Sequence, residues 1–194
     1  MSQRTRRAAS ALIPLSVIVM SGAVSALPAQ ADSPDFPGAR FASGSGNILY
    51  LAAGIGLPLL RDGHGGRNHA VRAADALGTS VLLAEGLKFI VREKRPDGSS
   101  RDSFPSGHAT AAFAVATMES QWHPREAPLW YLGAAVISAS RVATDRHYTQ
   151  DVIAGAALGY FTARLELSRP RGLILSPLLA PSQQMIGLQL TRAL

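Results

Sequence analysis

Residues 105–120 read PSGHATAAFAVATMES, and this stretch indicates most clearly how the chain folds. It begins with a proline, and Ser106 is a residue type that favours the N-terminal cap of a helix. The alanines that follow favour helix, while Phe113 and Met118 supply larger apolar side chains for a core. The stretch therefore predicts a helix over residues 107–120 that begins at Ser-Gly-His.

The rest of the chain has the same character on both sides of this helix. Apolar and small residues bounded by Gly, Pro and polar stops predict further helices over 48–60, 71–92, 129–144 and 151–167. In the longest helix one broad face is expected to pack into the core, formed by Leu77, Val81, Leu82, Leu87 and Val91. A glycine-rich loop is expected before it, up to Asn68. The sequence thus predicts an all-α protein, a single bundle of five or six helices.

The N-terminus is predicted to be a signal peptide over residues 1–31. Three arginines precede an apolar stretch, which ends in the small-x-small motif of residues 29–31. The alternative is a retained membrane anchor, which Pro14 and Gly22 disfavour because they interrupt the stretch. Export predicts a periplasmic or extracellular protein, with membrane association as the alternative. The absence of cysteine is compatible with export.

Three segments are predicted after the signal peptide. Residues 32–46 are rich in Pro, Gly and Ser and are expected to form a flexible lead-in. The helical domain follows over residues 47–170. Residues 171–194 alternate apolar and polar side chains only weakly, so a short strand and an extended, docked tail both stay open.

Composition limits the partners of the chain. Its 194 residues suit one domain, and 47% hydrophobic with 16% charged residues is typical of a globular protein. Without residues 1–31, which hold three of the 19 basic residues, 16 basic residues face 13 acidic ones, a net charge of +3. This charge is too mild to indicate nucleic-acid binding, so small anionic substrates fit better.

The lengths of the predicted helices indicate whether they can cross a membrane. A bilayer span needs about 20 mostly apolar residues, and charged residues interrupt the predicted helices before that length. This favours a soluble bundle or one with peripheral membrane contact. Small residues on the helices would also suit close packing in lipid or self-association into a homo-oligomer.

Three short clusters carry the chemistry. Lys88 and Arg95 lie seven residues apart, hence on one helical face, and Pro96 fixes the chain where it leaves the helix. Taken alone, such cations are more often a solvated surface. Ser106 and Gly107 open a helix whose N-terminal amides can bind an anion, since glycine lets the anion approach.

The third cluster pairs a histidine with a carboxylate. Asp151 stands one helical turn after His147, close enough to accept a hydrogen bond from its Nδ1 and leave Nε2 free as a nucleophile. Arg141 adds a cation six residues earlier. Each cluster is a weak signal alone, but their order within one short region indicates a site that moves a phosphoryl group.

The combination resembles the type 2 phosphatidic acid phosphatase and vanadium haloperoxidase superfamily. Its three-part signature is matched by Lys88-x6-Arg95-Pro96, by Pro105-Ser106-Gly107-His108, and by Ser140-Arg141-x5-His147-x3-Asp151. The resemblance covers roughly residues 46–166, and no signature position departs from the pattern.

The resemblance implies a role for each signature residue. His147 would attack phosphorus and become a phosphohistidine, Asp151 would orient it, and His108 would protonate the leaving oxygen and later activate water. The phosphate oxygens would be held by Lys88, Arg95, Ser106, Gly107 and Arg141. Charge stabilisation of this kind suits phosphoryl transfer, so no metal and no cofactor are expected.

Three functions follow as alternatives. The first is a metal-independent phosphatase for phosphate monoesters or for lipid phosphates and pyrophosphates, with vanadate as an inhibitor. The second is a haloperoxidase that uses vanadate as its cofactor, disfavoured because its relatives are much longer chains. The third is a catalytically silent binding protein of the envelope. The remaining histidines, His64, His69 and His123, are interpreted as surface or loop residues, the first two bordering the site entrance.

Overall fold

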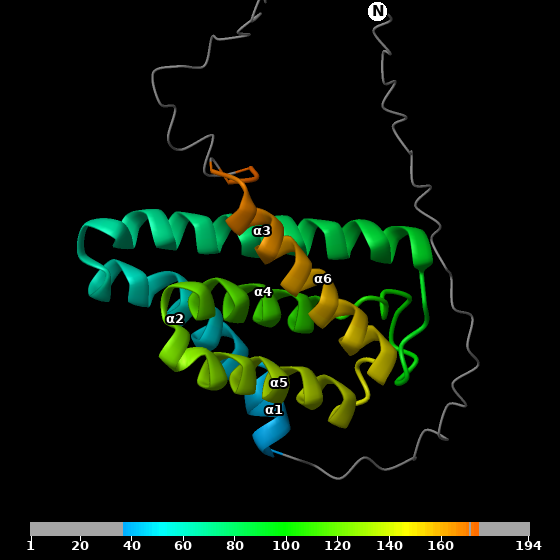
Figure 1. The fold of residues 1–194 in the computed structure, drawn as a ribbon. Coiled ribbons are helices and arrows are strands. Elements are labelled where there is room, and N and C mark those ends of the chain that lie inside the picture. The colour runs from blue at the N-terminus through cyan, green and yellow to red at the C-terminus, as the bar shows by residue number, and fades with distance from the viewer. Residues whose placement is uncertain (1–36, 171, 175–194) are drawn as a thin grey trace, which may run out of the picture. The chain divides into compact units, whose positions relative to one another are not determined.

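The computed structural model describes residues 37–170 and 172–174, and within these ranges the chain forms helices and loops without a β-strand. Figure 1 shows the helices packed on one another as a bundle. The elements are α1 (Pro37–Ser43), α2 (Ser45–Arg61), the 3-10 turn η1 (Gly63–Gly65), α3 (Gly66–Val91), α4 (Gly107–Trp122), the 3-10 turn η2 (Pro124–Glu126), α5 (Ala127–Ala143) and α6 (Thr149–Ser168). The predicted all-α bundle of five or six helices is confirmed.

Helix α4 is the centre of the bundle and packs against α2, α3, α5 and α6. Nearly all of its residues from Ala109 to Glu119 are buried, and most of these are small. Small side chains let neighbouring helices approach closely. The approach to the backbone of α6 is close, since a methyl group on Gly159 would lie 2.1 Å from the Thr110 carbonyl oxygen.

The core-facing side of α3 differs from the prediction. Leu82, Leu87 and Val91 are exposed, and only Leu77 packs against a core cluster. The buried positions of this helix are instead mostly small, and include Ala70, Ala73, Ala76, Ser80 and Ala84. The reason is geometric, since α3 lies against α2, α4 and α6 over its length and close helix packing leaves no room for leucine there.

Two loops of the prediction are helical in the structure. The described part of the lead-in, residues 37–46, forms α1 and the first turn of α2, and α1 packs against α5. The glycine-rich segment before α3 forms η1, and α3 begins at Gly66. Proline is tolerated in the first turn of a helix, which explains a start at Pro37.

Beyond α6 the described chain is short. The backbone amides of Leu173 and Ile174 each donate to the Asp75 carboxylate at 3.0 Å, which ties this segment to α3. The predicted signal peptide and the strand or tail over 175–194 lie outside the described residues. One described helical stretch, residues 37–61, is long and apolar enough to cross a membrane by length and composition.

Candidate active site

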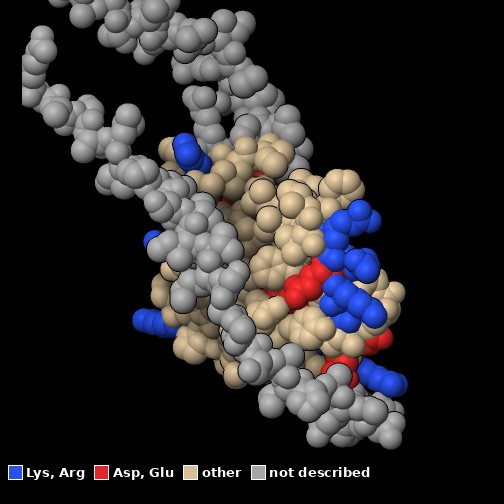
Figure 2. All heavy atoms as spheres, turned by 90° about the vertical axis from the view of Figure 1, so that its right-hand side faces the viewer, with Lys and Arg blue, Asp and Glu red and all other residues tan. Residues whose placement is uncertain are grey.

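The signature residues meet at one end of the bundle. This is the end where α3 and α5 finish and α4 and α6 begin, seen on the right in Figure 1. The loop of residues 92–106 crosses it between α3 and α4. Figure 2 looks onto this end and shows Lys and Arg side chains gathered along one side of it, with acidic side chains between them.

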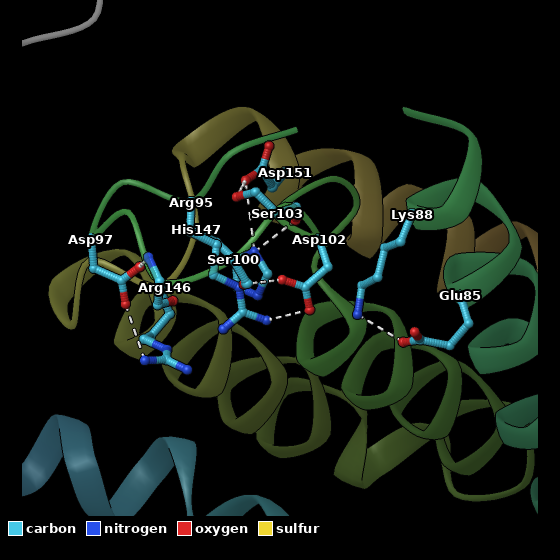
Figure 3. A network of polar contacts seen from close by, with 11 residues as sticks. Glu85, Lys88, Arg95, Asp97, Ser100, Asp102, Ser103, Arg146, His147 and Asp151 are labelled. Atoms are coloured by element: carbon cyan, nitrogen blue, oxygen red, sulfur yellow. Dashed lines mark hydrogen bonds and ion pairs between the residues drawn. The ribbon is translucent and has the colours of Figure 1, made fainter. Parts of the chain in front are cut away.

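His147 is buried and its ring is fixed through Nδ1. The Ser103 backbone carbonyl oxygen lies 2.7 Å from Nδ1, whereas the nearest Asp151 oxygen, Oδ2, lies 3.7 Å away. The predicted hydrogen bond between Asp151 and Nδ1 is therefore replaced by one to Ser103 (Figure 3). A carbonyl oxygen can only accept, so Nδ1 carries a proton, and in the neutral ring the lone pair lies on Nε2.

Asp151 supports this histidine as a buried carboxylate. Its Oδ2 accepts hydrogen bonds from Ser103 Oγ at 2.5 Å and from the Tyr148 amide at 2.9 Å. Burial opposes ionisation of Asp151, but the interactions with His147 and Ser103 outweigh it and keep its pKa below the usual value. A negative charge is thus held 3.7 Å from the imidazole.

Glu93 completes the group behind His147, and the sequence analysis missed it. Its carboxyl lies near the Asp151 carboxylate, and it accepts a hydrogen bond from Gln150 Nε2 at 3.1 Å. Burial and the Asp151 charge raise the pKa of Glu93. Because two neighbouring carboxyl groups cannot both ionise readily, Glu93 keeps its proton more firmly than an exposed glutamate.

The cations of the site are paired with two carboxylates in this structure. Lys88 Nζ lies 2.7 Å from Glu85 Oε1, and Arg95 lies 2.8 Å from Asp102 Oδ2 (Figure 3). Lys88 also borders the start of α4, because a methyl group on Gly107 would lie 3.4 Å from its Nζ. Lys88 therefore lies beside the first amides of α4, which can bind an anion.

Three buried donors at this end of the bundle have no acceptor among residues 37–170 and 172–174. They are Ser106 Oγ, Arg95 Nε and Arg141 Nε. Ser106 begins α4 as predicted, but its side chain does not cap the helix. A buried donor left unpaired is costly, so three of them at the same end of the bundle as Lys88 indicate a site built for an anion with several oxygens.

Burial shapes the charges of the two remaining signature residues. It lowers the pKa of Arg141 to about 10, so this side chain stays cationic at neutral pH. Burial and the Arg141 charge lower the pKa of His108 to about 4. The charges of His147 and Lys88 act on His108 in the same direction, which places all four residues near one another.

The other histidines lie at the opposite end of the bundle. His69 Nδ1 is 2.6 Å and His123 Nε2 is 3.0 Å from the Asp62 carboxylate, and the His69 ring stacks on Trp122. His69 lies within α3 and is partly buried, so the interpretation of this residue as a surface or loop residue was wrong. His123 lies in the loop between α4 and η2, as predicted. Neither His64 nor His69 borders the site entrance, because both lie at the opposite end of the bundle. His64 is exposed, as predicted. In the part of the chain that the structure describes, no three His, Asp or Glu side chains are grouped as metal ligands.

Comparison with known proteins identifies the family of this chain. The model of the PAP2 superfamily matches residues 70–172, more than half of the chain. A lipid A 1-phosphatase from Porphyromonas gingivalis is 34% identical over 98 residues, which cover 47% of this chain and 22% of the relative. A decaprenylphosphoryl-5-phosphoribose phosphatase from Mycobacterium tuberculosis is 33% identical over 121 residues, covering 58% of this chain and 64% of the relative.

A solved structure is also similar. The transmembrane PAP2 type phosphatidylglycerolphosphate phosphatase from Bacillus subtilis matches with a TM-score of 0.48 and 24% identity, over 66% of this chain and 70% of that chain. The chain spans less than two thirds of the length of the two curated relatives described above.

Proposed function

Since the chain belongs to the PAP2 superfamily, we propose that it is a phosphatase that hydrolyses phosphate monoesters through a phosphohistidine at His147. The observation that carries the proposal is the set of buried, unpaired donors: Ser106 Oγ, Arg95 Nε and Arg141 Nε. Together with Lys88 and the Gly107 amide they match the oxygens of a phosphate ester. Positioning and charge stabilisation of this kind supply most of the catalysis in phosphoryl transfer.

The first chemical step follows from the orientation of His147. The lone pair on Nε2 forms a bond to phosphorus while the bond from phosphorus to the ester oxygen breaks. The protonated His108 gives its proton to that leaving oxygen. The phosphorylated imidazole keeps its proton on Nδ1 and donates a hydrogen bond from it to the Ser103 carbonyl, and the Asp151 carboxylate offsets the positive charge.

The second step regenerates the protein. The neutral His108 accepts a proton from water as the water oxygen bonds to phosphorus. The bond between phosphorus and His147 Nε2 breaks, and inorganic phosphate leaves. Both steps need His108 to exchange a proton, although the pKa of His108 is about 4 without substrate. A bound phosphate dianion favours the imidazolium, so substrate binding itself prepares the acid.

We further propose that the phosphatase works at a membrane, on a phosphorylated lipid. The support is the distribution of large apolar side chains, which face outward on α2, α3, α5 and α6 while alanine fills the core. Examples are Leu60, Leu82, Leu132 and Phe161. A water-soluble protein rarely exposes so much apolar surface. The names of the two curated relatives describe phosphatases of lipid A and of decaprenylphosphoryl-5-phosphoribose.

Hydrolysis of p-nitrophenyl phosphate in EDTA tests the chemistry. We expect turnover that vanadate blocks and that His147→Ala loses by about 1000-fold or more, because its nucleophile is gone. The variant should keep the circular dichroism and melting temperature of the wild type. An acid-labile phosphoryl group should be trapped on the wild type and be absent from His147→Ala. Turnover of wild-type size in His147→Ala would contradict the mechanism.

A further inference from the structure

An open pocket adjoins the proposed phosphate site. Its volume is about 300 Å³, and it is lined by Glu85, Lys88, Phe89, Arg92, Arg101 and Asp102. Lys88 belongs to the phosphate site through its position beside Gly107. Asp102 is bound to Arg95, another residue of that site. The pocket is therefore the space into which a group next to the scissile phosphate would extend.

The charges of this pocket are not balanced. Both of its carboxylates already have a cation, since Glu85 pairs with Lys88 at 2.7 Å and Asp102 pairs with Arg95 at 2.8 Å. Arg92 and Arg101 have no carboxylate partner among the residues described. Neither arginine belongs to the three-part signature. Two uncommitted guanidinium groups thus face a pocket beside the phosphate site.

Arg92 has an unusual backbone conformation at the end of α3. This residue is the C-cap of α3 and has φ 52° and ψ 39°, the left-handed conformation for which glycine is favoured. Its amide donates to the Lys88 carbonyl at 3.0 Å, so its Cα lies one turn beyond Lys88. Arg92 therefore lies directly beyond the turn of α3 that carries Lys88, at the edge of the pocket.

We infer that Arg92 and Arg101 bind a second phosphoryl group of the substrate, next to the one that is cleaved. This inference rests on the proposed function and specifies its substrate class as phosphate esters with two phosphoryl groups. Guanidinium groups suit this role because they bind phosphate oxygens in pairs. Phe89, 83% exposed at the same pocket, offers an apolar contact to the remainder of the molecule. The second group could be joined directly, as in a diphosphate, or carried elsewhere on the headgroup.

Inhibition of p-nitrophenyl phosphate hydrolysis in EDTA tests the inference with three stable probes. Methylphosphonate carries one phosphoryl-like group, methylenediphosphonate carries two at the spacing of a diphosphate, and propane-1,3-diphosphonate carries two farther apart. We expect at least one diphosphonate to inhibit the wild type about tenfold more strongly than methylphosphonate. The probe with the stronger effect identifies the spacing of the two groups.

The double variant Arg92→Gln/Arg101→Gln should lose this preference, so that the ratio of the two inhibition constants approaches one. Arg125→Gln is the matched control, because Arg125 is an exposed arginine in η2 at the opposite end of the bundle. The control should keep the wild-type ratio. An unchanged ratio in the double variant, or no preference in the wild type, would overturn the inference. Turnover without His147 would instead refute the proposed phosphatase mechanism, so the two failures are distinguishable.

Discussion

The pKa of His108 predicts how the activity depends on pH. In the free protein, burial and the Arg141 charge lower this pKa to about 4. For an alkyl phosphate, whose leaving oxygen needs a proton, we expect kcat/KM to fall as the pH rises above about 4. We expect kcat to fall only at higher pH, because the bound phosphate dianion raises the pKa of His108 in the complex.

Profiles of both constants, corrected for ionisation of the substrate, provide the measurement. His108→Gln with p-nitrophenyl phosphate is the control, since nitrophenolate leaves without a proton. That variant should still form the phosphorylated protein and should hydrolyse it slowly, because water is no longer activated. Identical apparent pKa values in the two wild-type profiles would contradict the proposed effect of substrate on His108.

Glu93 gives a second prediction about a single residue. Its raised pKa means that it holds a proton next to Asp151 at low pH, and that its ionisation at higher pH adds a second negative charge there. Glu93→Gln keeps a donor for Asp151 and cannot ionise. We expect this variant to retain activity within about threefold at low pH and to decline less than the wild type as the pH rises.

Glu93→Ala separates this role from a general effect of substitution. It removes the carboxyl group that lies near Asp151 and interacts with it. We expect kcat to fall about tenfold, because the buried Asp151 loses a polar neighbour that helps to position it behind His147. Equal loss in the Gln and Ala variants, with unchanged pH profiles, would show that Glu93 has only a structural role.

At the scale of elements, the contact between α4 and α6 depends on glycine. A methyl group on Gly159 would lie 2.1 Å from the Thr110 carbonyl oxygen, and the backbone of a central helix cannot move away cheaply. We expect Gly159→Ala to lower the free energy of unfolding by about 1–3 kcal/mol, the usual cost of overpacking. Denaturant titration of the purified variant measures it.

Gly78→Ala is the matched control within α3. A methyl group there would meet no atom within 4 Å, and alanine favours the interior of a helix more than glycine does. This substitution should therefore raise the free energy of unfolding by about 0.5–1 kcal/mol. Shifts of the same sign in both variants would show that helix propensity, and not the approach of α6 to α4, dominates.

The same helices show what the sequence could predict. Their number and approximate ends followed from Gly, Pro and polar stops, because these residues act locally. The buried face of α3 did not follow, because alanines such as Ala73 and Ala84 give little hydrophobic contrast against the exposed Leu82. Hydrophobic periodicity assumes that large apolar residues point inward, and this protein reverses that assumption along much of α3.

The candidate site was predictable to a different degree. Residues such as Lys88 and His147 stand out because their chemistry and spacing are specific, and the structure places all the signature residues at one end of the bundle. Ser103 and Glu93 were missed because serine and glutamate are common in loops and at helix ends. Their contacts with His147 and Asp151 bridge different elements, so only the fold reveals them.

At the scale of the whole molecule, the outward-facing apolar side chains predict how the protein partitions. Leu82 on α3 is 65% exposed and Phe161 on α6 is 67% exposed. Burying such side chains in lipid contributes roughly 1.5–3 kcal/mol each, independently of salt. We therefore expect the protein to float with vesicles of neutral phosphatidylcholine, and to do so in high salt as well as in low salt.

The double variant Leu82→Gln/Phe161→Gln should float less, because glutamine remains better solvated in water than in lipid. Arg125→Gln, which changes a charge and leaves the apolar surface intact, should float like the wild type. Binding only to anionic vesicles and only at low salt would mean that the basic side chains, and not the apolar ones, make the contact. Since the site lies at one end of these same helices, apolar insertion would also bring a lipid headgroup within reach of His147 while its chains stay in the bilayer.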